Sequence, residues 1–430
     1  MPKISLVVAY IVLLTICISS LLIGAVTVDA AIYYVAATGD DARACTTAQT
    51  STTPKRTIAS GVACLNPGDT LYLRSGTYTE QIDLMGPNKS GTAGNYITIA
   101  GYPGETVTIQ YADLIENGLG PIKARGNRGY FIFENLVLDG IASTRFTGWQ
   151  IRDGNHHFIL RNLEIKNQKY NGVYIEGNDI QILNCKIHDA VPATEPGGGG
   201  SYYYGVYFHH GINGLIQGND IFNNSGGGIH AYPGPISNLV IRNNKIHDNN
   251  YIAGSKIGGI IVFEGSNTPI SGVQVYNNLV YNNGSAPTAG DAQGIRISNG
   301  PDATKVWNNT VYANKGWGIN IQAGTSPPTN TVVQNNIVFA NTDGQIVNAG
   351  TGSILGSNLT NNPNFVNGAA FDFNLQSSSL AIDAGVYLSD IKTDFMNRPR
   401  PQGTTHDIGA FEAGTASASA PAPPKGLKVF

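Results

Sequence analysis

A short phrase of apolar and polar positions recurs along most of the chain: an aliphatic residue, one or two Asn, a variable residue and another aliphatic residue. Each phrase is followed, some way on, by a Gly and a short alternating stretch. The phrases are Leu160–Ile165, Leu183–Ile187, Ile216–Ile221, Ile241–Ile246, Val275–Val280, Val306–Val311 and Val333–Val338. Equivalent positions are separated by 22, 34, 25, 34, 31 and 27 residues. A period of this length indicates one structural unit per phrase, stacked on its neighbours.

These units predict strands, because their apolar runs are too short for helices, are rich in β-branched residues and are flanked by Asn and Gly. A coil of about 22 residues cannot bury its own apolar face, so coils must stack. Stacking about 4.8 Å apart pairs each strand in parallel with its copy in the next coil. We therefore expect an all-β parallel β-helix of about ten coils. Its internal aliphatic stack is Ile165, Ile187, Ile221, Ile246, Val280, Val311 and Val338.

The second Asn of the phrase predicts an internal ladder of side-chain amides. Asn tolerates the left-handed backbone that such turns use, and each amide can bond the next amide and the turn backbone. The ladder positions are Asn219, Asn244, Asn278, Asn309 and Asn336, preceded in earlier coils by Leu136, Leu163 and Cys185. Surface Asn scattered in loops would not keep register with the aliphatic stack.

A second set of strands follows the Gly of each unit. The strands are Gly172–Glu176, Gly205–His209, Gly228–Tyr232, Gly259–Phe263, Gly294–Ser298 and Gly318–Gln322. Alternation with a period of two places Val173, Val206, Ile229, Ile260, Ile295 and Ile319 inside. Two outward columns result: Tyr174, Tyr207, His230, Ile261, Arg296, Asn320 and Glu176, His209, Tyr232, Phe263, Ser298, Gln322.

These columns concentrate aromatic, His, Glu and Arg side chains, and we expect a functional site on this exposed face. Aromatic faces can stack on sugar rings, and His and Arg serve proton transfer and carboxylate binding. Two inserts, Val191–Tyr204 and Asn249–Lys256, flank the face. The catalytic candidates are Tyr204, Tyr207, His209, His230 and Arg296, and the substrate-binding candidates are Tyr174, Glu176, His210, Tyr232, Phe263 and Glu264. No metal ligand is assigned, and the alternative is a solvated polar face with isolated aromatics.

A further outward column favours a structural interpretation. It consists of Lys166, His188, Phe222, His247, Tyr281, Tyr312 and Phe339. Aromatic residues recur evenly along the whole of this column, as side chains that stack between neighbouring strands do.

The two ends of the chain differ from the repeats in composition. Residues 4–28 are almost wholly apolar after Lys3, and small residues around Ala30 suit cleavage, so residues 1–30 resemble a secretory signal peptide. An uncleaved membrane anchor is the alternative, since the stretch is long enough to span a bilayer. The β-helix domain is predicted to cover residues 31–412, and residues 413–430 have the Ala/Ser/Pro composition of a flexible tail.

Composition and cysteine positions narrow the class of protein. A charged fraction of 13% and 53 Gly suit a turn-rich solenoid, and a net charge of −3 without a basic run gives no footprint for nucleic acid. In an oxidising compartment Cys45 and Cys64 can form a disulfide, which would contribute about 3 kcal/mol. Cys185 occupies a ladder position and is expected to be a buried thiol.

Two segments outside the repeats carry a family resemblance. Asn66–Tyr78 (NPGDTLYLRSGTY) and Tyr96–Gly104 (YITIAGYPG) resemble the opening of secreted right-handed β-helix proteins of the pectate-lyase-like superfamily. The end is similar too, in Asn362–Val366, Asp372–Leu375, Ala381–Gly385, Arg398–Pro401 and Asp407–Glu412. The resemblance implies a right-handed, single-stranded β-helix and a polysaccharide partner. It does not choose an activity, since that superfamily holds lyases, hydrolases, epimerases and non-catalytic members.

Local motifs weigh these activities differently. Tyr204–His209 resembles the Tyr-Gly-Phe-Asp-Pro-His motif of mannuronan C5-epimerases at Tyr204 and His209, but Tyr207 replaces the acid and Phe208 the Pro. Hydrolysis needs a close pair of carboxylates, which no strand here offers. A calcium ion needs clustered oxygens, and Glu176 and Glu264 lie about three coils apart, too far to share an ion without further ligands. No cofactor is therefore assigned, and Ca²⁺ is the one alternative kept open.

The first hypothesis is therefore β-elimination on a uronate polysaccharide. Arg296 would neutralise the carboxylate, His230 or His209 would take the C5 proton, and Tyr207 or Tyr204 would serve the leaving oxygen. The alternative is a non-catalytic glycan-binding surface or matrix protein, and the third reading is a C5-epimerase-like enzyme. We expect a secreted monomer, held at the cell surface if the apolar N-terminus is retained.

Overall fold

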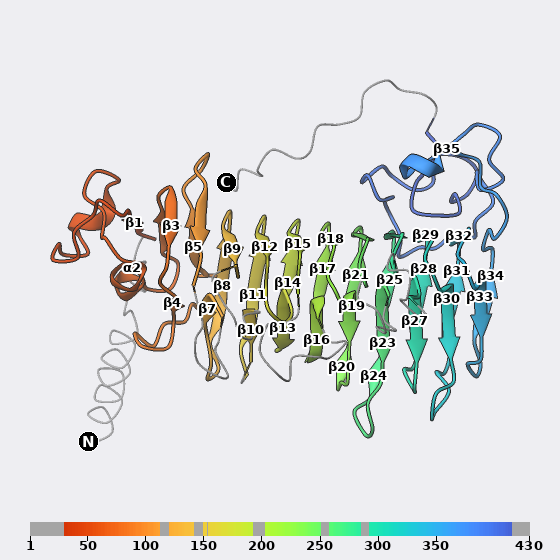
Figure 1. Ribbon diagram of the computed structural model, residues 1–430, viewed down its shortest axis with the longest axis horizontal. Coiled ribbons are helices and arrows are strands. Elements are labelled where there is room, and N and C mark those ends of the chain that lie inside the picture. The colour runs from red at the N-terminus through yellow and green to blue at the C-terminus, as the bar shows by residue number, and fades with distance from the viewer. Residues whose placement is uncertain are drawn as a thin grey trace, which may run out of the picture.

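The computed structural model describes residues 30–111, 120–141, 149–152, 154–191, 203–250, 258–284 and 292–414. Within them the chain winds into coils that follow one another along a single axis, giving an elongated rod (Figure 1). A full coil contributes one strand to each of three parallel sheets, in the order sheet 3, sheet 1, sheet 2. The predicted parallel β-helix is confirmed.

Sheet 1 runs the length of the rod. Its strands in the described residues are β1 (Ile32–Val35), β2 (Thr70–Leu73), β5 (Ile97–Gly101), β8 (Gly129–Glu134), β11 (His156–Arg161), β14 (Gln181–Leu183), β17 (Leu215–Gln217), β21 (Val240–Arg242), β25 (Gln274–Tyr276), β28 (Lys305–Trp307), β31 (Val332–Gln334) and β34 (Ile354–Gly356).

Sheet 2 follows sheet 1 across a two-residue turn in the described coils, except after β5, where the turn is longer. Its strands are β3 (Gly76–Tyr78), β6 (Val107–Ile109), β9 (Val137–Asp139), β12 (Glu164–Lys166), β15 (Lys186–His188), β18 (Asp220–Phe222), β22 (Lys245–His247), β26 (Leu279–Tyr281), β29 (Thr310–Tyr312) and β32 (Ile337–Phe339).

Sheet 3 carries the candidate site. Its strands are β10 (Trp149–Ile151), β13 (Val173–Glu176), β16 (Tyr204–Ile212), β19 (Gly227–Ala231), β23 (Ile260–Phe263), β27 (Ile295–Ser298), β30 (Trp317–Gln322) and β33 (Gly344–Asn348), with β20 (Ile236–Ser237) and β24 (Ile270–Ser271) beside them. The short parallel pair of β4 (Ile82–Asp83) and β7 (Ile122–Lys123) lies outside the three sheets.

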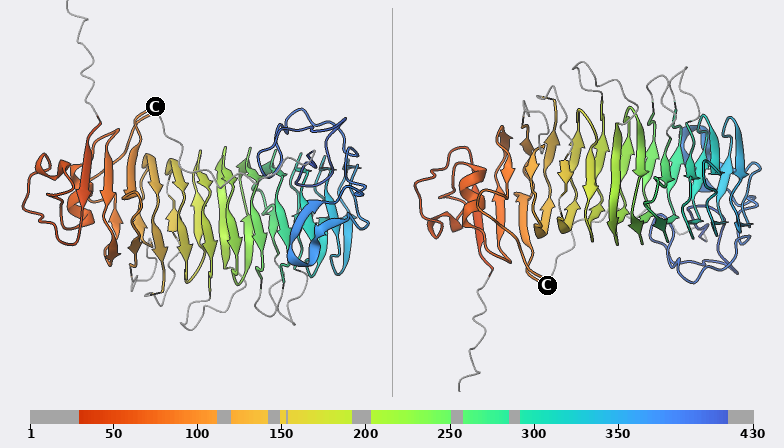
Figure 2. Two further views of the ribbon diagram at one scale, coloured as in Figure 1. Left: turned by 90° about the horizontal axis from the view of Figure 1, so that it is seen from above. Right: turned by 90° about the horizontal axis from the view of Figure 1, so that it is seen from below.

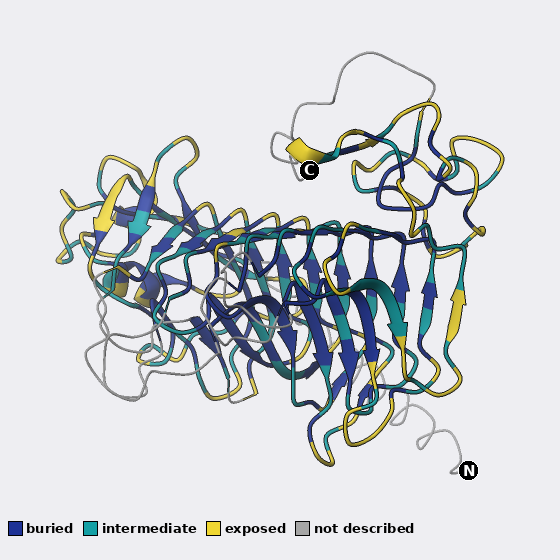
Figure 3. Cartoon of the chain, turned by 45° about the vertical axis from the view of Figure 1, so that its right-hand side comes forward, coloured by how far each residue is buried: buried dark blue, intermediate teal, exposed yellow. Residues whose placement is uncertain are grey.

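The core is the predicted aliphatic stack. Ile165, Ile187 and Ile221 are direct partners in successive strands of sheet 2, and the register continues to Val338 without a slip. Each of these side chains is at most 1% exposed. Figure 3 shows the resulting distribution, with the strands largely buried and exposure concentrated in the turns and at the ends.

The predicted Asn ladder lies inside the turn between sheets 1 and 2. Nδ2 of Asn244 donates to Oδ1 of Asn278 at 3.0 Å and to the Ile216 carbonyl at 2.9 Å. Oδ1 of Asn278 also accepts the backbone N–H of Asn244 at 3.0 Å. The same bonds link Asn219 to Asn336 and continue to Asn358, and Cys185 begins the run by donating its N–H to Asn219. The inward, fully bonded ladder is confirmed.

A second ladder runs in parallel at the turn between sheets 2 and 3, and the sequence analysis did not predict it. It consists of Asn224, Asn249, Asn283, Asn314 and Asn341, all at most 5% exposed. Nδ2 of Asn283, for example, donates to Oδ1 of Asn314 at 2.8 Å and to the Ile246 carbonyl at 3.1 Å. Gln345 accepts the last amide of this ladder. Each coil from Asn219 to Asn341 therefore contributes one amide to each ladder, and the two ladders fix the turns on either side of sheet 2.

The closing segment, residues 359–414, folds back over the last coils (Figure 2). It is bound by the first Asn of the repeated phrase, which has a left-handed backbone and faces outward. Nδ2 of Asn277 donates to the Thr393 carbonyl at 2.7 Å, and Nδ2 of Asn335 donates to the Val386 carbonyl at 2.8 Å. Within the segment β35 (Phe365–Asn367) pairs antiparallel with β36 (Asp372–Leu375), next to η2 (Gly368–Ala370). The segment packs on the outer side of the last coils, where Phe365, Phe373 and Phe411 join Leu279 and Ile337 in a second apolar cluster.

The opposite end is closed by η1 (Thr47–Gln49) and α2 (Ile58–Cys64), whose first turn is capped by the Thr57 hydroxyl. The predicted disulfide joins Cys45 to Cys64, with Cα atoms 5.5 Å apart. Cys185 is free and buried, and burial raises the pKa of its thiol to about 12. Both cysteine predictions are confirmed.

Loss of the disulfide should destabilise this end of the rod. Closing a loop with a sequence separation of 19 residues contributes about 3 kcal/mol in the chain-entropy model. The Cys45→Ser/Cys64→Ser variant should therefore unfold at lower urea concentration than wild type. Adding reductant should lower the midpoint of wild type and leave that of the variant unchanged, whereas equal midpoints in all four samples would show that the bridge does not stabilise the fold.

Residues 1–29 and 415–430 lie outside the described residues, so the signal-peptide and tail predictions remain predictions. In the described part of the chain, no helix has the length and apolar character needed to cross a bilayer.

Candidate functional site

The outer face of sheet 3 carries the first predicted column in register. Tyr207 is paired with His230, His230 with Ile261 and Ile261 with Arg296, in four successive coils. Tyr174 precedes this run and Asn320 follows it. The inward neighbours Val206, Ile229, Ile260 and Ile295 are fully buried, so the alternation fixes which side chains face outward.

The second column departs from the prediction at one point. Phe263, Ser298 and Gln322 are paired as expected. Glu176, however, is paired with His210 and not with His209, because the register shifts after Ile175. The shift is a β-bulge, in which two residues of one strand face one residue of the other. His209 is therefore the extra residue in β16.

A continuous aromatic cluster surrounds His230. Its ring stacks on Tyr207 with centroids 5.4 Å apart and planes at 13°, and on Tyr232 at 5.3 Å and 7°. Tyr204 packs against it at 4.6 Å. Tyr232 in turn contacts Phe263 at 5.2 Å, and the guanidinium carbon of Arg296 lies 5.7 Å from the Phe263 ring centre. Aromatic rings thus follow one another along this face, and the Arg296 cation contacts the row at Phe263.

The expectation that His230 is an exposed side chain is wrong. The residue is only 9% exposed, because tyrosine rings cover it on several sides. Burial, with a smaller effect from the Arg296 charge, lowers the pKa of His230 to about 3, so the imidazole is neutral. Its Nδ1 is buried without a hydrogen-bond partner among the described residues. Replacing this residue therefore changes packing as well as chemistry.

Tyr204 is also fully buried, which leaves Tyr207 as the accessible one of the two candidate tyrosines. The carboxylate of Glu264 is held locally, since its Oε2 accepts the backbone N–H of Ile270 at 2.9 Å. The flanking inserts predicted from the sequence fall largely outside the described residues, at 192–202 and 251–257.

Glu176 is held by two partners. The Tyr174 hydroxyl donates to Oε1, and Nε of Arg152 donates to Oε2 at 3.1 Å. Burial raises the pKa of the Glu176 carboxyl, but the Tyr174 hydrogen bond and the Arg152 charge outweigh burial and hold it below its usual value. Burial lowers the pKa of His209, whose Nδ1 lies 3.6 Å from Oε1 of Glu176. A carboxylate and a neutral imidazole therefore sit side by side.

The column on sheet 2 has the structural character predicted for it. The rings of His188, Phe222, His247 and Tyr281 stack with centroids 4.8, 5.2 and 4.8 Å apart and planes within 7°. Both nitrogens of His247 also meet carboxylates, Asp248 at 2.6 Å and Asp220 at 3.0 Å. These groups serve packing.

This arrangement gives stability a pH dependence. Burial lowers the pKa of His247, but its bonds to Asp220 and Asp248 outweigh burial, so the pKa lies above 6.5. A raised pKa in the folded state contributes stability below pH 6.5 that is lost as the pH rises through the folded value. We expect His247→Phe, which keeps the ring, to remove this loss of about 1 kcal/mol. Urea midpoints from pH 5.5 to 9 would test it; an unchanged slope in the variant would contradict it.

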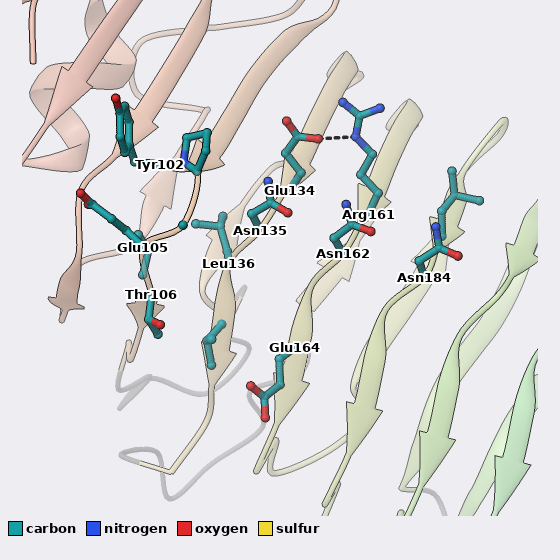
Figure 4. Close-up of a pocket in the computed structure, with 15 residues that line it drawn as sticks. Tyr102, Glu105, Thr106, Glu134, Asn135, Leu136, Arg161, Asn162, Glu164 and Asn184 are labelled. Atoms are coloured by element: carbon teal, nitrogen blue, oxygen red, sulfur yellow. Dashed lines mark hydrogen bonds and ion pairs between the residues drawn. The ribbon is translucent and has the colours of Figure 1, made fainter. Parts of the chain in front are cut away.

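A separate hollow of about 860 Å³ lies over the turns between sheets 1 and 2 in the first coils (Figure 4). The charged residues that line it are already paired: Glu105 with Arg74 outside the hollow, Arg161 with Glu134, and Glu164 with Lys166. Its floor includes the outward amides Asn135, Asn162 and Asn184. Further along the same row of turns, the equivalent amides bind the closing segment. This hollow therefore continues the row of outward Asn amides that binds the closing segment further along. It offers no unpaired acid and base for catalysis among the residues that line it.

Comparison with known proteins identifies the fold. Residues 33–259 match the family model described as Pel9A-like, right handed beta helix region, and residues 199–363 match a second model, right handed beta helix region. No curated protein sequence matches the chain.

Solved structures agree with the family models. The structure of pectate lyase Pel9A is 19% identical, with a TM-score of 0.62 over 89% of this chain and 96% of that one. A complex of XylC with xylose is 11% identical, with a TM-score of 0.52 over 89% of this chain and 99% of that one. A rhamnogalacturonan lyase is 16% identical, with a TM-score of 0.51 over 78% of this chain and 91% of that one. At these identities the likeness concerns the fold, and it confirms the right-handed β-helix expected from the end segments.

Proposed function

Because this chain belongs to the Pel9A-like family of right-handed β-helix proteins, we propose that it cleaves an acidic polysaccharide by β-elimination on the outer face of sheet 3. Two proteins of similar fold are named as a pectate lyase and a rhamnogalacturonan lyase. The observation that carries the proposal is the column in which Tyr207 is paired with His230, and Arg296 lies in the same column one coil beyond Ile261.

Binding of a sugar chain would use the aromatic cluster and the cation. The rings of Tyr207, Tyr232 and Phe263 present apolar area to sugar faces, and their contacts with one another hold them in place. Arg296 lies two coils beyond His230 in the same column, where its guanidinium can bind and neutralise a uronate carboxylate. Neutralisation makes the neighbouring C5 proton easier to remove.

In the chemical step, His230 acts as the base and Tyr207 as the acid. His230 removes the C5 proton, a C4–C5 double bond forms, and the C4–O bond breaks. Tyr207 donates a proton to the leaving oxygen. Because the pKa of His230 is about 3, the base is unprotonated at neutral pH, and a carboxylate bound nearby raises its pKa toward the working range. His209 is left out of this step, since its ring is engaged with Glu176 and His210.

The disulfide supports the proposed export of the protein. A disulfide between Cys45 and Cys64 persists in oxidising surroundings, which supports export of the protein to the place where polysaccharides occur.

A second candidate function is glycan binding without catalysis. The observation that favours it is the burial of His230, which covers most of the proposed base. The epimerase reading has less support, because Tyr204, one of its two matching residues, is fully buried.

Arg296→Gln separates these functions when compared with Arg242→Gln. Arg242 is a matched control, since it lies over Tyr276 on sheet 1 at 5.8 Å, in the same kind of contact, but away from sheet 3. On uronate polymers, wild type and Arg242→Gln should form unsaturated product, seen by its ultraviolet absorbance, and Arg296→Gln should be at least about 100-fold slower. Retention of glycan by wild type with no product from any uronate polymer would establish binding alone and overturn the lyase proposal.

A further inference from the structure

The β-bulge in β16 brings three metal-ligating side chains to one place. In a regular strand, consecutive side chains point to opposite faces. Here the register shift sets both His209 and His210 against Glu176 of the neighbouring strand. One oxygen of Glu176 and one nitrogen of each ring all lie within 4.8 Å of one another. Bulges that re-aim side chains in this way are frequent beside functional sites.

The separations within this cluster suit a single small cation. Nδ1 of His209 lies 3.0 Å from Nδ1 of His210 and 3.6 Å from Oε1 of Glu176. A tetrahedral zinc ion with bonds of about 2.0–2.2 Å holds its ligand atoms about 3.3–3.5 Å apart. The first of these two distances lies just below that range and the second just above it. We propose that Glu176, His209 and His210 form a binding site for a divalent transition-metal ion, with zinc as the best match.

The surroundings hold the ligands in place, as metal sites require. The Tyr174 hydroxyl and Nε of Arg152 bind the two oxygens of Glu176 and fix its orientation. The ring of Tyr174 packs against His209 at 5.4 Å. The positive charge of Arg152 opposes a cation, but it is paired with Oε2, so Oε1 is the oxygen that faces His209.

The ligand set selects the class of metal. Two imidazoles and one carboxylate suit zinc and its neighbours in the first transition row, whereas calcium takes six to eight oxygens. Three protein ligands leave a fourth position for water or a substrate oxygen. The His209 side chain is 29% exposed, and His210 lines a hollow of about 300 Å³. The site is therefore accessible, and it does not depend on β-elimination taking place.

Titration of the full chain, prepared without a polyhistidine tag, with zinc chloride in a calorimeter would test the site. Wild type should bind one zinc ion, and Glu176→Gln and His210→Ala should each bind at least tenfold more weakly. His156→Ala is the matched control: Nδ1 of His156 lies 2.8 Å from Nδ1 of His157, but this pair does not belong to the three-ligand cluster. It should bind zinc as wild type does.

Melting curves would show whether the variants are folded. If either Glu176→Gln or His210→Ala is unfolded, the other one still tests the site. X-ray absorption of the zinc-loaded wild type gives an answer that needs no variant. It should show two imidazole nitrogens and carboxylate or water oxygens around the metal. Absence of zinc binding by wild type, equal binding by all variants, or a metal shell without two imidazoles would each overturn the site.

Discussion

His230→Phe should slow formation of unsaturated product at least about 100-fold, the usual contribution of a general base, while the melting temperature at neutral pH stays close to that of wild type. Phenylalanine keeps the stacking on Tyr207 and Tyr232 and removes the buried nitrogen that lacks a partner. His230→Ala should lose the same activity and also several degrees of melting temperature, because it empties a space between rings. Initial rates and thermal melts of the three proteins would show this.

His230→Phe should also change how stability depends on pH in the acid range, which replacement of an exposed, unperturbed residue would not do. Because the folded pKa of His230 is about 3 and its ordinary value is 6.5, only the unfolded chain takes up this proton between those values. Stability is thus lost as the pH falls from 6.5 toward 3. His230→Phe should be more stable than wild type at pH 4, and an equal acid response in both proteins would contradict the buried, neutral histidine.

Asn278→Leu should be among the most destabilising single changes in the rod. Asn278 sits mid-ladder and receives the backbone N–H of Asn244 while donating to the Ile241 carbonyl at 2.9 Å. Leucine leaves both backbone groups buried and unpaired at about 1–3 kcal/mol each, or about 2–6 kcal/mol in all. Urea denaturation of the purified variant would measure the loss.

Asn277→Leu would not serve as a control, because Asn277 binds the closing segment. Asn184→Leu also changes an Asn of the repeated phrase at a turn between sheets 1 and 2, but Asn184 lies in the open hollow, where its side chain is accessible. Its cost should come from the left-handed backbone alone, about 1 kcal/mol. Equal losses in Asn184→Leu and Asn278→Leu would show that ladder bonding is not the source.

The sequence predicted the features that depend on local period. Alternation placed Val206 and Ile229 inside, and the spacing of repeats set Ile187 against Ile221, because a slip of one residue would turn every core side chain outward. The second ladder has the same kind of signal in the sequence. Asn249 and Asn283 each follow a first-ladder Asn by five residues.

Other features depend on contacts that no period encodes. The bulge at His209 arises from pairing between β13 and β16, so alternation alone placed the wrong histidine opposite Glu176. Alternation likewise predicted that His230 faces outward, but not that Tyr204 and Tyr207 would cover it. For this reason the elements of the site were predictable, whereas the exposure of its base and the cluster of Glu176, His209 and His210 were not.

The most direct test of β-elimination on the sheet 3 face is the mass of the products that the full chain releases from uronate polymers. Wild type should release oligosaccharides lighter by one water than the products of hydrolysis, each with an unsaturated terminal sugar, and Arg296→Gln should release almost none. Products of hydrolytic mass, or polymers left intact by wild type, would contradict the assignment.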